Sequence, residues 1–139
     1  MDAEQMRKRG APFTDRSWAL LRGYLLKFNK RATATEAKRG EGKGNVVCDP
    51  KAKVEGALYE ISEAGLLKLD DREKGYYRVE LWVEGKDGTG REAWVYIAHP
   101  DMVREGLKPT CEYLHRYLAG RDLLSEEYCE MLAMVETLD

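Results

Sequence analysis

This sequence contains few of the residues that form disulfide frameworks and metal sites. It contains three cysteines, Cys48, Cys111 and Cys129, without Cys-x-x-Cys spacing, and only two histidines, His99 and His115. An odd set of separated cysteines indicates reduced thiols rather than a disulfide framework or a zinc site. No serine or cysteine stands in a recognisable nucleophile motif with either histidine. We therefore expect no metal and no cofactor.

Long hydrophobic runs are also lacking. Apolar stretches such as residues 18–21 and 132–135 are short. A membrane-spanning helix needs roughly 18 or more apolar residues, so none is expected. Residues 1–10 are rich in charge and do not resemble a signal sequence. The expected compartment is the cytoplasm.

The charge balance lacks a strong excess of either sign. The 139 residues carry a net charge of -2, with 43% hydrophobic and 35% charged residues. This composition is typical of a globular protein with an ordinary core, and the length suits a single domain over residues 1–139. It does not favour nucleic acid as a partner.

The first third of the chain predicts a helix, a strand and a loop. Asp2 can cap a short helix over residues 2–9. The aromatic and aliphatic residues of 17–28 favour a strand, because Gly23 would weaken a helix, although a helix remains the alternative. Residues 29–44 are rich in lysine, arginine, glycine and threonine and predict a loop. It is either simply solvated or attracts an anionic substrate.

The middle of the chain predicts mainly strands. Residues 46–48 and 54–61 suit two strands separated by an Asp49-Pro50 turn. Two alternating segments, 76–84 and 91–99, predict a hairpin through the glycine-rich turn between them.

Helices are predicted in three further places. Ser62 can cap a helix that ends near Arg72, with its leucines, Leu66, Leu67 and Leu69, facing inward. A second helix follows Pro109 and stops at Gly120. Ser125 can cap a final helix, whose apolar stripe comprises Tyr128, Met131, Leu132, Val135 and Leu138. The predicted class is α+β.

An ordered series of short motifs resembles the gamma-glutamylcyclotransferase-like family. The series includes Arg-Gly-Tyr-Leu-Leu-Lys-Phe-Asn at 22–29, Lys-Val-Glu-Gly-Ala-Leu-Tyr-Glu-Ile at 53–61, and Leu-Asp-Asp-Arg-Glu-Lys-Gly-Tyr-Tyr at 69–77. Ala-Trp-Val-Tyr-Ile-Ala at 93–98 and Lys-Pro-Thr-Cys-Glu-Tyr-Leu at 108–114 continue it. The resemblance implies a small mixed β-barrel with flanking helices and a cavity for a gamma-glutamyl group.

The same resemblance implies a reaction and a site. In this family the α-amine of a gamma-glutamyl substrate attacks its own γ-carbonyl and releases 5-oxoproline. Glu73 matches the general acid/base, while Tyr77 and Tyr113 match substrate-binding positions. A carboxylate beside an apolar wall can perform both proton transfers. Glu55 and Glu80 are rival acids that the motif does not select.

Two departures from the family pattern leave alternatives open. Members normally begin with a strand and a Tyr-Gly-Ser-Asn loop, which would end where Met1 stands, so the first strand and substrate loop are expected to be missing. An unpaired sheet edge could then promote a homo-oligomer, and an inactive binding or interaction module is the alternative function. The order Arg72-Glu73-Lys74-Gly75 resembles the glutathione-degrading ChaC-type branch, whereas the length suits the small AIG-type, gamma-glutamylamine cyclotransferase branch. The leaving group therefore stays open.

Overall fold

A curled antiparallel sheet with helices on both sides forms the described part of the chain. The computed structural model describes Met6 and residues 13–139. The spatial order of the strands is β2-β1-β3-β4, and their bounds are β1 (Phe13–Arg31), β2 (Gly42–Ile61), β3 (Tyr76–Gly85) and β4 (Gly90–Ala98). The helices are α2 (Glu63–Arg72), α3 (Cys111–Leu118) and α4 (Glu126–Ala133), with a 3-10 turn η1 (Pro100–Met102). The predicted α+β class is confirmed.

The two halves of β2 are continuous, which corrects the prediction of two separate strands. Between the pairs Arg22↔Lys53 and Tyr24↔Cys48, β1 advances by two residues and β2 by five. The Asp49-Pro50 segment lies in this irregularity, where the Asp49 side chain accepts a hydrogen bond from the Lys51 N–H at 3.0 Å. Pairing with β1 resumes on both sides, so the turn signal produces a bulge instead of a chain reversal.

Strand β1 is longer than predicted at both ends, and the loop after it is correspondingly shorter. The predicted strand over residues 17–28 is confirmed within Phe13–Arg31, and the loop covers residues 32–41. Lys30, expected in a solvated loop, is 2% exposed. Its ammonium lies 4.8 Å from the centre of the Tyr76 ring, so a cation–π contact accompanies its burial.

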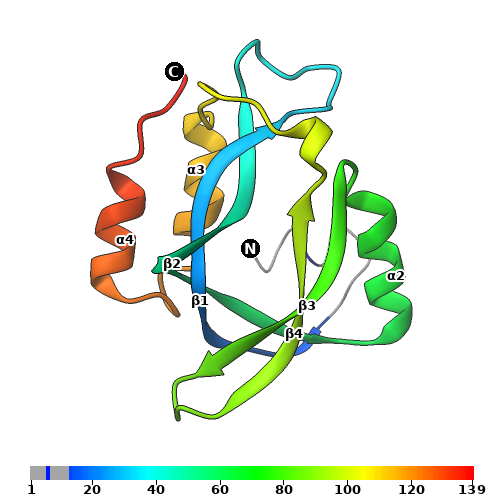
Figure 1. The fold of residues 1–139 in the computed structure, drawn as a ribbon, viewed down its shortest axis with the longest axis vertical. Coiled ribbons are helices and arrows are strands. Elements are labelled where there is room, and N and C mark those ends of the chain that lie inside the picture. Colours follow the sequence, from blue (N-terminus) through cyan, green and yellow to red (C-terminus); the bar gives the residue numbers. More distant parts are fainter. Residues whose placement is uncertain (1–5, 7–12) are drawn as a thin grey trace.

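The sheet curls so that its edge strands approach each other. β2 and β4 are in contact although no ladder joins them within the described residues. In Figure 1, α2 lies beside β3 and β4, and α3 and α4 lie on the other side beside β1 and β2. The barrel implied by the family resemblance thus takes the form of a curled sheet, with β2 and β4 as its edge strands.

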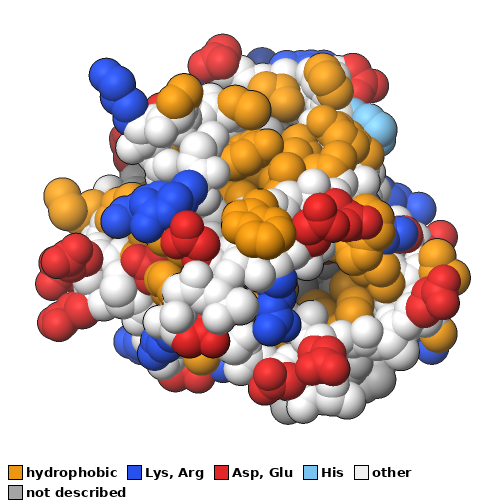
Figure 2. Space-filling model, turned by 60° about the horizontal axis from the view of Figure 1, so that its bottom comes forward, with side chains coloured by type: hydrophobic (Ala, Val, Ile, Leu, Met, Phe, Trp, Pro, Cys, Tyr) orange, Lys and Arg blue, Asp and Glu red, His pale blue; other side chains and the backbone are white. Residues whose placement is uncertain are grey.

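Two clusters of buried hydrophobic side chains lie among the described residues. Ala19, Leu21 and Val83 form the one between β1 and β3, and Met6 packs with Leu69 of α2 in the other. Leu67, predicted to face inward, is 60% exposed because it lies on the solvent side of α2. On the face shown in Figure 2, hydrophobic side chains gather among acidic and basic ones, and the surface is hollowed there.

The predicted final helix is shorter than expected. Leu132 is buried, but Met131 is exposed, and α4 ends at Ala133, before Val135 and Leu138. No described helix has the length and apolar character needed to cross a membrane. The predicted helix over residues 2–9 lies, apart from Met6, outside the described residues.

Turn and cap chemistry explains where the helices and the hairpin begin. Ser62 accepts a hydrogen bond from the Gly65 N–H and Ser125 from the Tyr128 N–H, which confirms both predicted caps. The predicted hairpin is also confirmed, and the Gly85 N–H donates to the Thr89 carbonyl at 2.9 Å across its turn.

We predict that Ser62→Ala lowers the free energy of unfolding by about 1 kcal/mol, because a donor in the first turn of α2 loses its acceptor. Urea denaturation followed by circular dichroism measures this change. Ser62→Thr, which keeps the hydroxyl, is the matched control and should lose less. Equal losses in both variants would contradict a capping role.

Candidate active site

Glu73 stands at the junction of α2 and β3. It is the C-cap of α2, where its N–H donates to the Leu69 carbonyl at 2.8 Å, and its own carbonyl accepts from the Tyr76 N–H at 3.3 Å. Gly75 has φ +83°, a left-handed conformation that favours glycine and lets the chain turn directly into β3. The tight turn fixes the backbone on both sides of Glu73.

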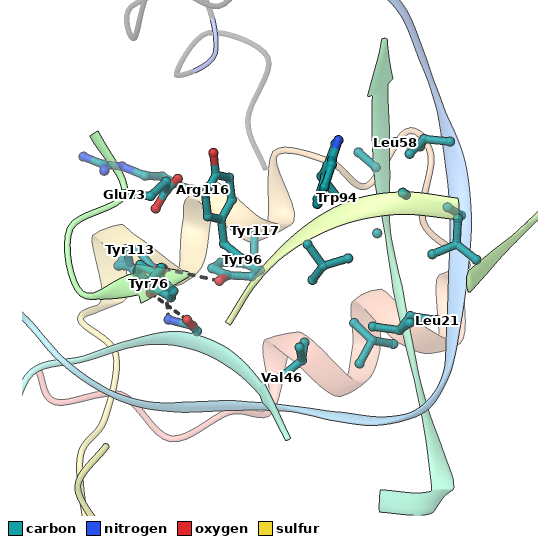
Figure 3. Close-up of a pocket in the computed structure, with 18 residues that line it drawn as sticks. Leu21, Val46, Leu58, Glu73, Tyr76, Trp94, Tyr96, Tyr113, Arg116 and Tyr117 are labelled. Atoms are coloured by element: carbon teal, nitrogen blue, oxygen red, sulfur yellow. Dashed lines mark hydrogen bonds between the residues drawn. The ribbon is translucent and has the colours of Figure 1, made fainter. Parts of the chain in front are cut away.

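A cavity of about 350 Å³ opens beside this turn. Figure 3 shows that its polar side chains gather at one end, and these are Glu73, Tyr76, Tyr96, Tyr113, Arg116 and Tyr117. The other end is formed by aliphatic and aromatic side chains, among them Leu21, Leu58 and Trp94. This volume suits a small molecule, and the division into two ends suits a ligand with one polar and one apolar part.

Three tyrosines and a glycine backbone form a hydrogen-bonded chain at the polar end. The Tyr76 hydroxyl donates to the Gly44 carbonyl at 2.7 Å, and the Gly44 N–H donates to the Tyr113 hydroxyl at 3.0 Å. The Tyr113 and Tyr117 hydroxyls lie 3.3 Å apart. A Cβ at Gly44 would overlap the Tyr117 hydroxyl, so this close approach requires glycine.

The electrostatics of this end keep Tyr117 protonated. Burial raises the pKa of Tyr117 well above its ordinary value, and the neighbouring Tyr113 and Glu73 act in the same direction. Lys30 lies behind the turn, where burial lowers its pKa and the negative charge of Glu73 opposes that effect. Glu73 therefore has a buried cation on one side and neutral hydroxyl groups near the cavity.

An ion pair attaches the end of α2 to the hairpin. Asp70 receives two hydrogen bonds from Arg78, at 2.9 and 3.0 Å, and one from the Tyr96 hydroxyl at 2.6 Å. The bond from Tyr96 is the largest influence that lowers the pKa of Asp70, and Arg78 adds to it. Because Asp70 is one turn before Glu73, these contacts hold the turn in place.

The cavity contains two of the three residues suggested by the sequence. Glu73 and Tyr113 both line it, whereas Tyr77 is 39% exposed and its ring lies 5.2 Å from that of His99. Successive side chains of a strand point to opposite faces, so Tyr76, not Tyr77, faces the cavity.

Sequence reasoning missed the remaining polar groups of the cavity. Tyr117 and Arg116 carried a usable signal, because positions three and four after Tyr113 share its helix face. Gly44, Tyr76 and Tyr96 lie on three different strands and meet the residues of α3 only in the folded chain. Within the described part of the chain, no cluster of histidine, cysteine, aspartate and glutamate could hold a metal ion.

Comparison with protein families shows the family to which the chain belongs. The model of the family described as "Gamma-glutamyl cyclotransferase, AIG2-like" matches residues 4–118. The chain belongs to this family. The match covers most of the chain, from the part preceding β1 to the end of α3, and confirms the resemblance inferred from the sequence motifs.

Several solved structures share the fold of this family member. One described as gamma-glutamyl cyclotransferase aligns with TM-score 0.85 and 22% identity, over 99% of this chain and 83% of that one. An uncharacterized Homo sapiens protein aligns with TM-score 0.81 and 22% identity, over 98% and 81%. YkqA from Bacillus subtilis aligns with TM-score 0.79 and 20% identity, over 98% and 52%. A comparison with curated proteins found no match.

We predict that Tyr96→Phe reduces stability at pH 7 by about 1.5 kcal/mol, because a hydrogen bond to a charged carboxylate is lost. The folded-state pKa of Asp70 lies below its ordinary value of 3.8, so this stabilisation is present above about pH 4 and is lost as the pH falls through the folded-state pKa. Urea denaturation at pH 7 and pH 3 should show the deficit of the variant shrinking at low pH. Tyr77→Phe is the control, and a pH-independent deficit would refute the assignment.

Proposed function

We propose that this family member is a cyclotransferase that releases 5-oxoproline from a small gamma-glutamyl amine or peptide. The observation that carries the proposal is the position of Glu73, whose carboxylate lines the polar end of a cavity together with tyrosine hydroxyls. The reaction needs no external nucleophile, because the substrate supplies its own amine. A small cavity with one proton-transferring carboxylate is therefore sufficient.

Glu73 would act as base and then as acid. It takes a proton from the substrate's α-ammonium, and the free amine attacks the γ-carbonyl carbon to form the new C–N bond. The protonated Glu73 then gives this proton to the leaving nitrogen as the original amide bond breaks. Attack leaves one surplus proton on the ring nitrogen, which the regenerated carboxylate accepts and passes to the released amine. The products are therefore 5-oxoproline and an ammonium ion, and the carboxylate returns to its starting state.

The tyrosine pair would stabilise the oxyanion of the tetrahedral intermediate. Of the two hydroxyl hydrogens of Tyr113 and Tyr117, one bridges the pair at 3.3 Å, and the other can be donated to the substrate. The raised pKa of Tyr117 keeps its hydrogen in place. One donor to a developing oxyanion contributes about 3 kcal/mol in comparable sites. In this scheme the tyrosine whose hydrogen does not bridge the pair donates it to the reacting carbonyl, while Tyr76 holds the Gly44 backbone that supports both tyrosines.

The apolar end of the cavity supports an uncharged leaving group. Its aliphatic wall is formed by Leu21, Val46, Val54, Leu58, Val83 and Val95. If the gamma-glutamyl head lies beside Glu73, the leaving group extends towards this wall. A carboxylate buried there without a cationic partner would be costly, by several kcal/mol. The cavity therefore favours gamma-glutamyl amines over gamma-glutamyl amino acids and peptides.

We predict that Glu73→Gln lowers the rate of 5-oxoproline release by about 10²- to 10⁴-fold without unfolding the protein, because the amide cannot carry the proton. Chromatographic detection of 5-oxoproline from a panel of gamma-glutamyl amines, peptides and glutathione tests this. Asp71→Asn, an exposed residue of α2 that does not line the cavity, is the matched control. Undiminished turnover in Glu73→Gln would exclude Glu73, and silence from the folded wild-type protein would favour the alternative of a binding module.

We predict that gamma-glutamyl isopentylamide is turned over with a kcat/KM at least about tenfold higher than gamma-glutamyl-leucine, which differs only by a carboxylate on the leaving group. The physical reason is that none of the described residues that form the apolar wall carries a positive charge. Initial rates of 5-oxoproline release measure the ratio. Equal or higher kcat/KM for gamma-glutamyl-leucine would contradict the proposed orientation of the substrate.

A further inference from the structure

We propose that Arg116 is a specificity-determining residue whose guanidinium binds the α-carboxylate of the gamma-glutamyl head, so that the cavity selects ligands in which this carboxylate is free. The inference rests on the proposed function for the identity of the ligand. It adds a recognition group that neither the sequence motifs nor the family match identifies.

The position of Arg116 follows from the geometry of α3. Arg116 lies three residues after Tyr113 and one before Tyr117, so all three can face the cavity from one side of the helix, and all three line it. Figure 3 shows Arg116 at the same end of the cavity as Glu73. The Arg116 guanidinium would therefore lie close to a head group that the two tyrosines bind.

The present partner of Arg116 holds it weakly. Its guanidinium lies 3.5 Å from the Glu112 carboxylate, and the side chains of the two residues are 42% and 85% exposed. Exposed pairs of this kind contribute about 0.3–0.5 kcal/mol, so a substrate carboxylate can replace Glu112 at little cost. Arginine binds carboxylates through two parallel N–H donors, which fixes orientation as well as charge.

The two neighbouring lysines either pair with another residue or lie outside the cavity. Lys43 pairs with Glu41 at 2.9 Å and lies 4.2 Å from the centre of the Tyr113 ring. Lys30 is buried behind the Glu73 turn and does not line the cavity. Arg116 is the cation among the described residues that line it.

The charge pattern of the polar end matches an amino-acid head. Such a head carries an α-ammonium and an α-carboxylate on one carbon, and Glu73 and Arg116 present the two opposite charges. Glu73 must approach the ammonium in order to accept its proton, so the carboxylate is left for Arg116. The two contacts together orient the amine towards the γ-carbonyl.

The test compares two ligands in two proteins. Gamma-glutamyl isopentylamide and its α-carboxamide analogue differ in the charge of one group. Their affinities are measured by titration calorimetry on the Glu73→Gln protein, in which the ligand is not consumed, at pH 6, where both α-amines are protonated. We expect the carboxamide to bind about 10- to 100-fold more weakly, because a charge-assisted hydrogen-bonded pair is lost. Adding Arg116→Gln should reduce this ratio to about one.

Two further variants separate recognition from a structural effect. Arg116→Lys keeps the charge without the two-pronged geometry and should give an intermediate ratio. Arg121→Gln, on the exposed segment after α3, is the matched control and should leave the ratio unchanged. A merely structural role would weaken both ligands equally. An unchanged ratio in Arg116→Gln, or no binding of either ligand to a folded protein, would overturn the inference.

Turnover of the same ligands by the wild-type protein distinguishes the two proposals. If binding depends on Arg116 as expected but no 5-oxoproline is released, the proposed reaction fails and the recognition role stands. If the first ligand releases 5-oxoproline and its carboxamide analogue releases 5-oxoprolinamide with equal kcat/KM, the reaction stands and the recognition role fails.

Discussion

The pairing of β1 with β2 is the constraint on which the cavity depends. These long strands remain paired across a bulge in which β2 carries three residues more than β1, and Gly23 opposite it has φ +82°. Bulges increase the local twist and bend the strand, so the sheet curls and its edge strands meet. A flatter sheet would keep β2 apart from β4, and the side chains of both strands that line the cavity would not surround one space.

The polar end depends on a second constraint, the close approach of the Gly44 backbone to α3. Tyrosines from a strand and a helix bond to its carbonyl and its amide. These bonds satisfy polar groups that the fold withdraws from water, and they fix the positions of the tyrosine hydroxyls. A site that must hold a substrate in a cyclising conformation benefits from such rigidity, because positioning contributes much of the rate of intramolecular attack.

The turn that carries Glu73 is held by contacts of its own. Its helix is capped at one end by Ser62, and near the other end Asp70 binds Arg78 and Tyr96 of the hairpin. The buried Lys30 supplies positive charge behind the turn. The sequence motif around Glu73 and the arrangement of the cavity thus point to the same turn for the proposed proton transfer.

The sequence by itself determined the local features: the helix caps at Ser62 and Ser125, the hairpin, the α+β class and the motif around Glu73. Each of these depends on residues close together in the chain. Only the tertiary structure decided that Asp49-Pro50 forms a bulge, that Lys30 is buried, and that Tyr76 rather than Tyr77 faces the cavity with Gly44 and Tyr117. The physical reason is that strand register and curl arise from pairing between distant segments, and a shift of one residue reverses which side chains face inward.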